Sequence, residues 1–302
     1  MRRYLVLLPI LLLWACKPPE ESHMKVVIGA VMMDGLGGPP VSNSVVVVSG
    51  NEIREVGTSS NIPIPAEADK IDGGGRFLAP GLVDVCAAAE PRGMIQAESA
   101  DEARKAVAAV IAGHAPAIHI GKMPPAAMQA ALEAAREASL PILGHIATQA
   151  EAKSLVDRGV SGLVGMIRDT EDLDPGLLNR LRDLKIVVAP ALASLPAGSG
   201  LEMARRNTAR MFKAGVLLAA ASAGADLQRE AEALADAGIP PLDVIVAATH
   251  NSALALHQAD RAGSIQPGHE ANLLLLSANP GEDIRNLRRV AGRFVAGEWS
   301  QK

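Results

Sequence analysis

The middle of the chain alternates short apolar runs with longer, alanine-rich segments of helical periodicity. The apolar runs fall at residues 117–120, 141–145, 162–165, 186–189 and 216–220. The helical segments fall at residues 100–112, 126–138, 149–158, 175–184, 201–214, 229–237 and 242–256. Strands that alternate with helices in this way indicate parallel βαβ units. The pattern therefore predicts an α/β fold in which the strands close into a (β/α) barrel.

Both ends of the chain show a different pattern. Residues 25–28 and 45–56, and again 264–276 and 290–297, are short apolar runs bounded by Gly, Pro, Asn and Ser, which is typical of strands and turns. We therefore expect a small composite β-sandwich domain, formed by residues 25–79 and 263–302, with the barrel at residues 80–262 between them. Pro267 and Gly268 are expected to turn the chain between two strands of that domain.

The N-terminus predicts export. Two arginines precede an apolar run of twelve residues, Tyr4 to Ala15, which is shorter than the roughly 20 residues that a membrane-spanning helix needs. Residues 1–15 therefore indicate a signal peptide, and its end, Leu-Trp-Ala-Cys16, resembles a bacterial lipobox in which Cys16 is lipidated. The alternative is an ordinary secretory signal, with Cys16 lost on cleavage. In the first case, residues 16–24 form a tether from the membrane to a protein of the bacterial cell envelope.

Composition limits the partners and the core of the mature chain. Hydrophobic residues make up 49% of the sequence but aromatic ones only 2%, so the core must consist of Ala, Val, Leu and Ile. The net charge of -4 and the lack of a long basic run argue against nucleic acid as a partner. If Cys16 is lipidated, Cys86 is the only other cysteine, and an intrachain disulfide is excluded.

Four segments of the chain stand out as motifs: Asn-Glu-Ile-Arg-Glu-Val-Gly at 51–57, Ile-Asp-Gly-Gly-Gly-Arg-Phe-Leu-Ala-Pro-Gly-Leu-Val-Asp at 71–84, Ala-Ala-Thr-His-Asn-Ser-Ala at 247–253 and Gly-Ser-Ile-Gln-Pro-Gly at 263–268. Together they resemble signatures of the amidohydrolase superfamily, most closely its imidazolonepropionase-like and prolidase-like branch. The resemblance extends from about residue 25 to residue 297. It implies the family's barrel with its composite β-domain.

The barrel of this chain is short. Pro80 to Arg261 spans about 180 residues, whereas a closed eight-fold barrel takes about 250. With strand one, which carries Cys86, the five runs given above make six strands in this span, so two βα units, the second and the third, are expected to be missing. The fold class predicted is therefore a shortened barrel of the metal-dependent-hydrolase type.

The resemblance also implies a metal centre, whose ligand positions are largely changed here. The strand-one histidines correspond to Cys86 and Ala88, the bridging lysine to His119, the strand-five histidine to His145, the next histidine to Gly165 and the catalytic aspartate to Ala223. Only His145 keeps the family residue, and alanine and glycine have no side-chain donor for a metal. No carboxylate replaces the general base at Ala223, and Asp226, three residues on, is expected to be a solvated loop carboxylate.

Two hypotheses for function follow from this degenerate site. In the first, the chain is a non-catalytic envelope lipoprotein without a cofactor, which binds a small molecule or an envelope protein. In the alternative, Cys86, His119 and His145 hold one zinc ion, and the chain hydrolyses C–N bonds of peptide-like or non-peptide substrates. Against the zinc site, cysteine is commonly a small buried hydrophobe, and both histidines suit hydrogen-bonded packing positions. The sequence leaves the oligomeric state open, including a homo-oligomer.

Overall fold

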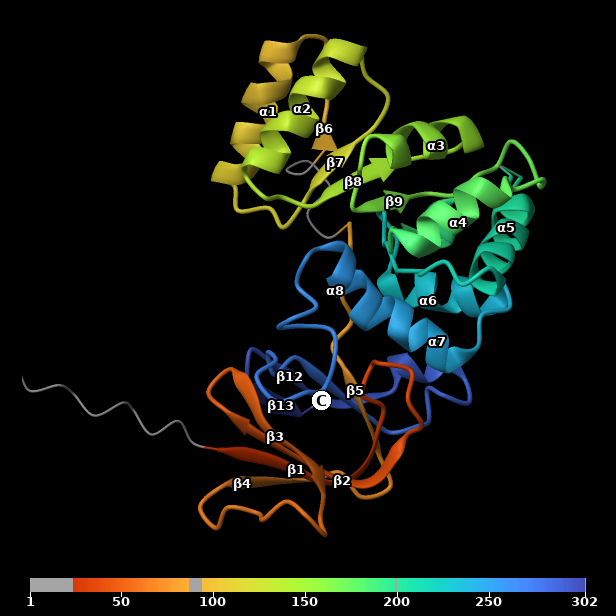
Figure 1. Cartoon of the computed structure of the whole chain (residues 1–302). Coiled ribbons are helices and arrows are strands. Elements are labelled where there is room, and N and C mark those ends of the chain that lie inside the picture. The colour runs from red at the N-terminus through yellow and green to blue at the C-terminus, as the bar shows by residue number, and fades with distance from the viewer. Residues whose placement is uncertain (1–23, 87–93, 199, 302) are drawn as a thin grey trace, which may run out of the picture.

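The computed structural model describes residues 24–86, 94–198 and 200–301. The predicted signal peptide, Cys16 and Ala88 lie outside these residues. Strands from both ends of the chain build a sheet domain, drawn in red, orange and blue, and the middle of the chain builds a helix-rich domain beside it (Figure 1). Within the described residues, no helix combines the length and the apolar character needed to cross a membrane.

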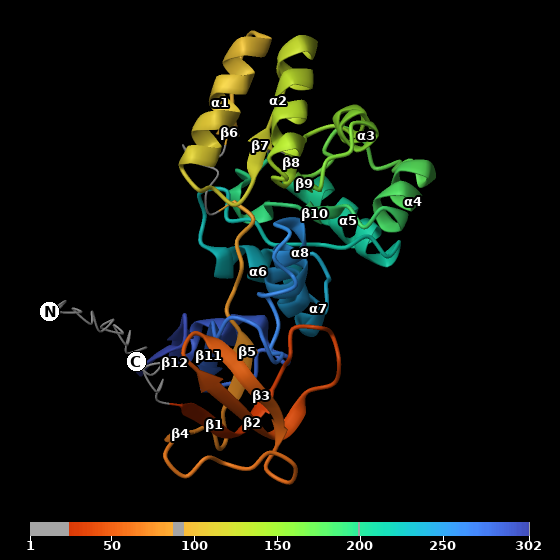
Figure 2. The ribbon, with the colours of Figure 1, turned by 60° about the vertical axis from the view of Figure 1, so that its left-hand side comes forward.

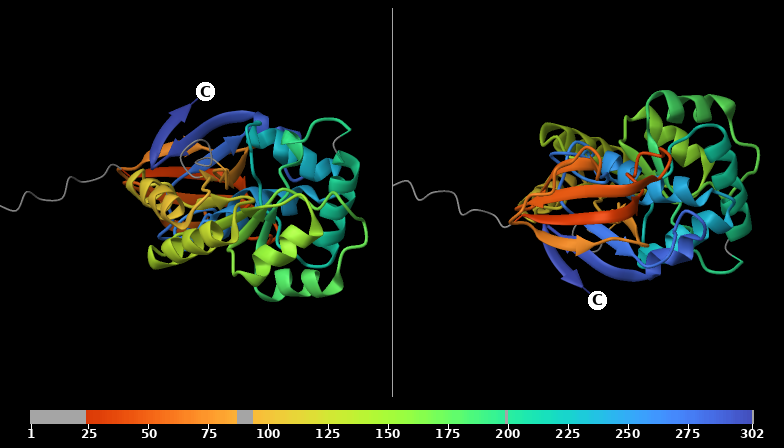
Figure 3. Two further views of the ribbon diagram at one scale, coloured as in Figure 1. Left: turned by 90° about the horizontal axis from the view of Figure 1, so that it is seen from above. Right: turned by 90° about the horizontal axis from the view of Figure 1, so that it is seen from below.

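The sheet domain is one eight-stranded sheet. Its strand order is β13-β12-β11-β5-β1-β2-β3, and β4 pairs with β1. The strands are β1 (Lys25–Met32), β2 (Val41–Ser49), β3 (Glu52–Thr58), β4 (Asp69–Asp72), β5 (Phe77–Pro80), β11 (Leu273–Leu276), β12 (Val290–Val295) and β13 (Glu298–Gln301). Strand β5 pairs with β1 on one side and with β11 on the other. The red and blue strands of the two chain ends therefore lie together (Figure 3).

Burial on both faces explains the continuous valine run of β2. Val46 and Val48 belong to a buried cluster with Leu273 and Phe294, whereas Val45 and Val47 face a second cluster on the other side. Alternate residues of a strand point to opposite faces, so a strand covered on both faces is apolar throughout.

A turn near the C-terminal end also joins the two chain ends. Gly268 has a φ of 85°, a left-handed conformation that glycine adopts without steric cost. Its N–H donates to the Ile53 carbonyl at 2.8 Å, and the Ile53 N–H donates to the His269 carbonyl at 2.8 Å. The predicted fold class, a shortened barrel with a β-domain formed by both ends, is confirmed, but the strands of that domain belong to one sheet where we expected a β-sandwich.

The barrel contains a five-stranded parallel sheet with the order β10-β9-β8-β7-β6. Its strands are β6 (Met94–Ile95), β7 (Ile118–Ile120), β8 (Ile142–His145), β9 (Gly162–Val164) and β10 (Val187–Ala189). The helical elements are α1 (Ala100–Ala112), α2 (Pro125–Glu137), α3 (Gln149–Asp157), α4 (Pro175–Asp183), η2 (Leu192–Ser194), α5 (Leu201–Lys213), α6 (Leu227–Asp236), α7 (Pro241–Val246), η3 (Ala247–Asn251), α8 (Ser252–Ala255) and η4 (Ile284–Arg288). Helices α1 and α2 stand side by side (Figure 2).

Two irregular segments, one at residues 216–220 and one around Val85, extend the barrel beyond this sheet. The expected strand at residues 216–220 is not regular, but Leu218 forms a bridge with Val188 of β10. On its other side, the Val85 N–H donates to the Ala220 carbonyl at 3.2 Å. Strand β6 was not expected, because two residues are too few to give a periodic pattern in the sequence.

The helix expected at residues 242–256 is interrupted by η3, a π-helical turn. Polar side chains at the end of this turn and at the start of α8 bond to the neighbouring irregular strand. Asn251 donates to the Leu218 carbonyl at 2.8 Å, and the Ser252 hydroxyl accepts from the Ala220 N–H at 3.1 Å and donates to the Ala247 carbonyl at 2.7 Å. Such side-chain bonds compete with regular helical bonds. The family-like segment at 247–253 therefore attaches the last helix to the barrel.

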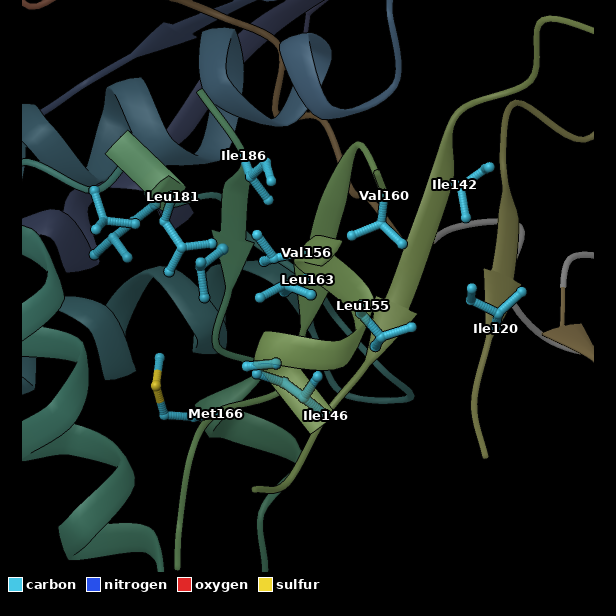
Figure 4. Close-up of a cluster of buried hydrophobic side chains, with 14 of the residues drawn as sticks. Ile120, Ile142, Ile146, Leu155, Val156, Val160, Leu163, Met166, Leu181 and Ile186 are labelled. Atoms are coloured by element: carbon cyan, nitrogen blue, oxygen red, sulfur yellow. The ribbon is translucent and has the colours of Figure 1, made fainter. Parts of the chain in front are cut away.

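Aliphatic side chains fill the layer between the parallel sheet and its helices. Figure 4 shows Ile142 and Leu163 of the strands among Leu155 and Val156 of α3, with Leu181 of α4 beside them. These five side chains are all at most 6% exposed. Burying each aliphatic side chain stabilises the fold by about 1.5–3 kcal/mol, which explains how a chain poor in aromatic residues forms its core.

Candidate functional site

The two predicted histidines meet at the barrel sheet. His119 lies within β7, and His145 is the last residue of the neighbouring strand β8. Nδ1 of His119 lies 3.0 Å from Nε2 of His145, a hydrogen-bonding distance. The ring centroids are 5.2 Å apart, with an angle of 58° between the ring planes. His119 is 1% exposed, so this hydrogen bond is largely shielded from water.

The surroundings of His119 keep its ring neutral. Burial, followed by the nearby His145, lowers the pKa of His119 to about 4, although a hydrogen bond with the Val85 carbonyl acts in the opposite direction. A neutral imidazole has one N–H and one lone pair. The carbonyl of Val85 can only accept, so the hydrogen-bond network assigns the N–H to Val85 and the lone pair on Nδ1 to His145. In this arrangement neither ring nitrogen of His119 is available to a metal ion.

Cys86 lies near Ala223, the position of the family's catalytic aspartate. Cys86 is 7% exposed. Burial and the neighbouring Asp84 raise the pKa of its thiol to about 12, and a hydrogen bond from the Ala223 backbone only partly opposes this. Asp84 Oδ1 accepts from the N–H groups of Cys86 and Ser222, both at 2.9 Å. Asp84 therefore links the segment of Cys86 to the segment of Ser222. Cys86 itself stays a thiol, the form that neither binds metals well nor attacks as a nucleophile.

Glu230 is a buried acid that none of the sequence motifs had singled out. It lies in the first turn of α6 and is completely buried. Its Oε2 accepts from the Ala193 N–H at 2.7 Å, and within the described part of the chain its Oε1 has no hydrogen-bond partner. Burial raises the pKa of Glu230 to about 7, against the hydrogen bonds from the backbone of residues 191–193. One signal was present, since Glu230 shares a helix face with the buried Leu234 four residues later.

The family's remaining ligand positions do not restore a metal centre. Gly165 has a φ of 94°, and a Cβ at this position would lie 2.4 Å from the Ile146 carbonyl oxygen, so no side chain fits there. Asp226 caps α6 and pairs with Arg288, as a solvated carboxylate does. Within residues 24–86, 94–198 and 200–301, no three His, Cys, Asp or Glu side chains are placed to hold a metal ion. The residues described therefore do not fit the binuclear centre.

A cavity of about 320 Å³ adjoins His145. It lies between the segment after β7 and helix α3, and its lining includes Lys122, Met128, Leu155 and Arg158. A lining that combines apolar side chains with a few charged ones is typical of small-molecule sites. This cavity, which lies at the carboxyl ends of β7 and β8, is therefore the candidate binding site.

Comparison with known proteins agrees with the fold. The chain aligns with the structure of molinate hydrolase with a TM-score of 0.77 and 15% identity, over 93% of this chain and 95% of that chain. A Xaa-Pro dipeptidase with bound methionine gives a TM-score of 0.79 and 15% identity, over 92% of this chain and 100% of the other. The ochratoxinase of A. niger gives a TM-score of 0.78 and 16% identity, over 93% of this chain and 96% of the other. At these identities the likeness concerns the fold alone.

No curated protein matches the sequence. The family model described as the amidohydrolase family matches residues 57–299. This range includes the barrel and strands of the sheet domain from both ends of the chain. Because the match covers well over half of the sequence, the chain belongs to the amidohydrolase family.

Proposed function

We propose that this protein is a non-catalytic binding protein built on the amidohydrolase fold. The observation that carries the proposal is the hydrogen bond between His119 and His145, 3.0 Å long. This hydrogen bond pairs His145, the one ligand position that keeps the family residue, with His119. The family's chemistry uses a metal ion to polarise the substrate and to generate hydroxide from bound water. The backbone at Gly165 excludes a side chain, so a ligand for the second metal has no place there. Position 223 holds alanine, so the general base is missing as well.

The ligand we propose is a small molecule in the cavity beside His145. The apolar side chains of Met128 and Leu155 offer buried contact area, and both are at most 8% exposed. Lys122, Arg158 and Glu151 line the same cavity, so its charged side chains carry both signs. The alternative occupant is an envelope protein, since we also propose that lipidated Cys16 anchors the chain to the membrane of the bacterial cell envelope.

Elemental analysis of protein purified without chelator, combined with a hydrolysis screen, tests the proposal. We expect less than one equivalent of zinc and no turnover of lactams, hydantoins or dipeptides, because the described residues lack a metal-binding group. His145→Ala serves as the control, since any activity from a metal held by His145 would be lost in it. One or two equivalents of zinc, or turnover that this substitution abolishes, would overturn the proposal and favour the hydrolase alternative instead.

A further inference from the structure

A second cavity, of about 450 Å³, lies at the amino ends of the barrel strands. Its lining includes Lys185, which precedes β10, and residues 215–218, which begin the irregular strand. Leu36, in the loop after β1, lines it as well, and this loop lies beside α7 (Figure 2). The cavity beside His145 lies at the carboxyl ends of the strands, so the two cavities are separate.

Apolar side chains line the second cavity and are exposed beside it. Phe212 of α5 and Leu254 of α8 are among its apolar lining residues. Leu36 is 42% exposed, and Leu184, the residue before Lys185, is 59% exposed. Exposed apolar side chains that gather around a cavity, rather than lying scattered, mark an interaction surface. We call the cavity lining, together with Leu36 and Leu184, the amino-end surface.

The amino-end surface carries two unpaired charges of opposite sign, since Lys185 and Asp243 both line the cavity. Lys185 precedes β10, whereas Asp243 lies in the first turn of α7. Within residues 24–86, 94–198 and 200–301, neither side chain takes part in an ion pair, with the other or with a third residue. A partner that complements this surface must therefore present one acid and one base.

A second copy of this chain meets that requirement. In a two-fold symmetric dimer the same surface contacts itself, so residue i of one protomer contacts residue j of its partner, and j contacts i. A two-fold rotation can therefore bring Asp243 to Lys185 and, at the same time, Lys185 to Asp243. It can also place an exposed leucine of one protomer against the apolar cavity of the other. The amino-end surface is thus self-complementary in charge and in apolar character.

We propose that the amino-end surface is the interface of a two-fold symmetric homodimer, in which Lys185 pairs with the partner subunit's Asp243 and Leu184 packs into the partner's cavity. Apolar side chains such as Phe212 and Leu254 form the centre of the interface, and the two ion pairs set its register. The cavity beside His145 stays accessible in both protomers, because it lies at the other end of the barrel. Dimerisation does not depend on what that cavity binds.

Charge reversal at the two positions provides the test. Sedimentation velocity of the purified full-length chain, over a range of concentrations, measures the dissociation constant of the dimer. We expect the wild type to dimerise. Lys185→Glu and Asp243→Lys should each weaken dimerisation at least about tenfold, because each substitution sets like charges opposite each other at two contacts.

Mixing the two variants gives the sharpest result. In an equimolar mixture of Lys185→Glu and Asp243→Lys, a heterodimer joins opposite charges at both contacts, so it should form about as tightly as the wild-type dimer. Neither variant should dimerise as well alone. Association through any other part of the chain would not depend on these two charges, so it would not reproduce this pattern.

Two further variants serve as controls. Lys105→Glu reverses a charge on α1, which does not line the cavity, so the dissociation constant should not change. Leu184→Ser replaces an exposed side chain and should weaken the dimer without altering any charge, which tests the interface even if Asp243→Lys fails to fold by circular dichroism. The proposal is overturned if the wild type is a monomer at every concentration, if the single reversals leave dimerisation unchanged, or if the mixture of folded variants stays monomeric.

Discussion

Glu230 gives the protein a pH-dependent stability that one substitution should remove. Its carboxyl group is completely buried, and burial raises its pKa from 4.5 to about 7. The folded protein therefore favours the protonated form. The stabilisation that this form provides is fully present below pH 4.5 and is lost as the pH rises through about 7. The difference between the two pKa values corresponds to about 3 kcal/mol.

Glu230→Gln mimics the protonated carboxyl group at every pH. Its amide oxygen can still accept from the Ala193 N–H, which lies 2.7 Å from Oε2 in the wild type. The free energy of unfolding should be similar for both proteins at pH 4.5. At pH 8 the variant should be more stable by up to about 3 kcal/mol. Both proteins contain the same histidines, so comparing their free energies of unfolding at each pH cancels the contribution of histidine titration to the pH dependence.

Urea unfolding followed by circular dichroism at several values between pH 4.5 and pH 8 measures this difference. Glu202→Gln is the matched control, because Glu202 also lies in the first turn of a helix, α5, but its side chain is 70% exposed. That control should change stability by less than about 0.5 kcal/mol, independently of pH. A constant difference between wild type and Glu230→Gln across this range would refute the reasoning.

The remaining predictions concern the anchor and the sheet domain. Cys16→Ser should release the protein from the membrane fraction or leave the precursor unprocessed, because lipid chains on Cys16 would provide the anchor; a processed, membrane-bound product would contradict this. Deleting the residues after Gly263 should abolish hydrogen-exchange protection of N-terminal amides such as Val27 and Leu78, because β11 pairs with β5, which pairs with β1. Protection that survives the deletion would show that the N-terminal strands fold without the C-terminal ones.

The regular parts of the barrel could be predicted because their signals are local. Alanine-rich periodicity placed the first helix at residues 100–112, and the structure has α1 at Ala100–Ala112. The helix expected at 242–256 was interrupted because Asn251 and Ser252 bond to a strand segment about thirty residues earlier in the chain, Leu218 to Ala220. Such a tertiary contact leaves no periodic signal in the sequence.

The candidate site was predictable in its residues more than in its geometry. Family positions drew attention to His119 and His145, but only the pairing of β7 with β8 brings their rings together. Glu230 was missed because an acid in the first turn of a helix is usually explained by the helix dipole. Its burial depends on the backbone of η2, which contributes the Ala193 N–H to the carboxylate.

The conformation of Gly165 has a consequence for protein engineering. A histidine placed there would require the chain to move away from the Ile146 carbonyl, because a Cβ would lie 2.4 Å from that oxygen. Ala223, also at positive φ, 42°, poses a milder problem, since aspartate tolerates that conformation better than most residues. Grafting the family's ligands onto this scaffold must therefore begin with a redesigned loop after β9. Substituting side chains one at a time would produce strained intermediates before any metal could bind.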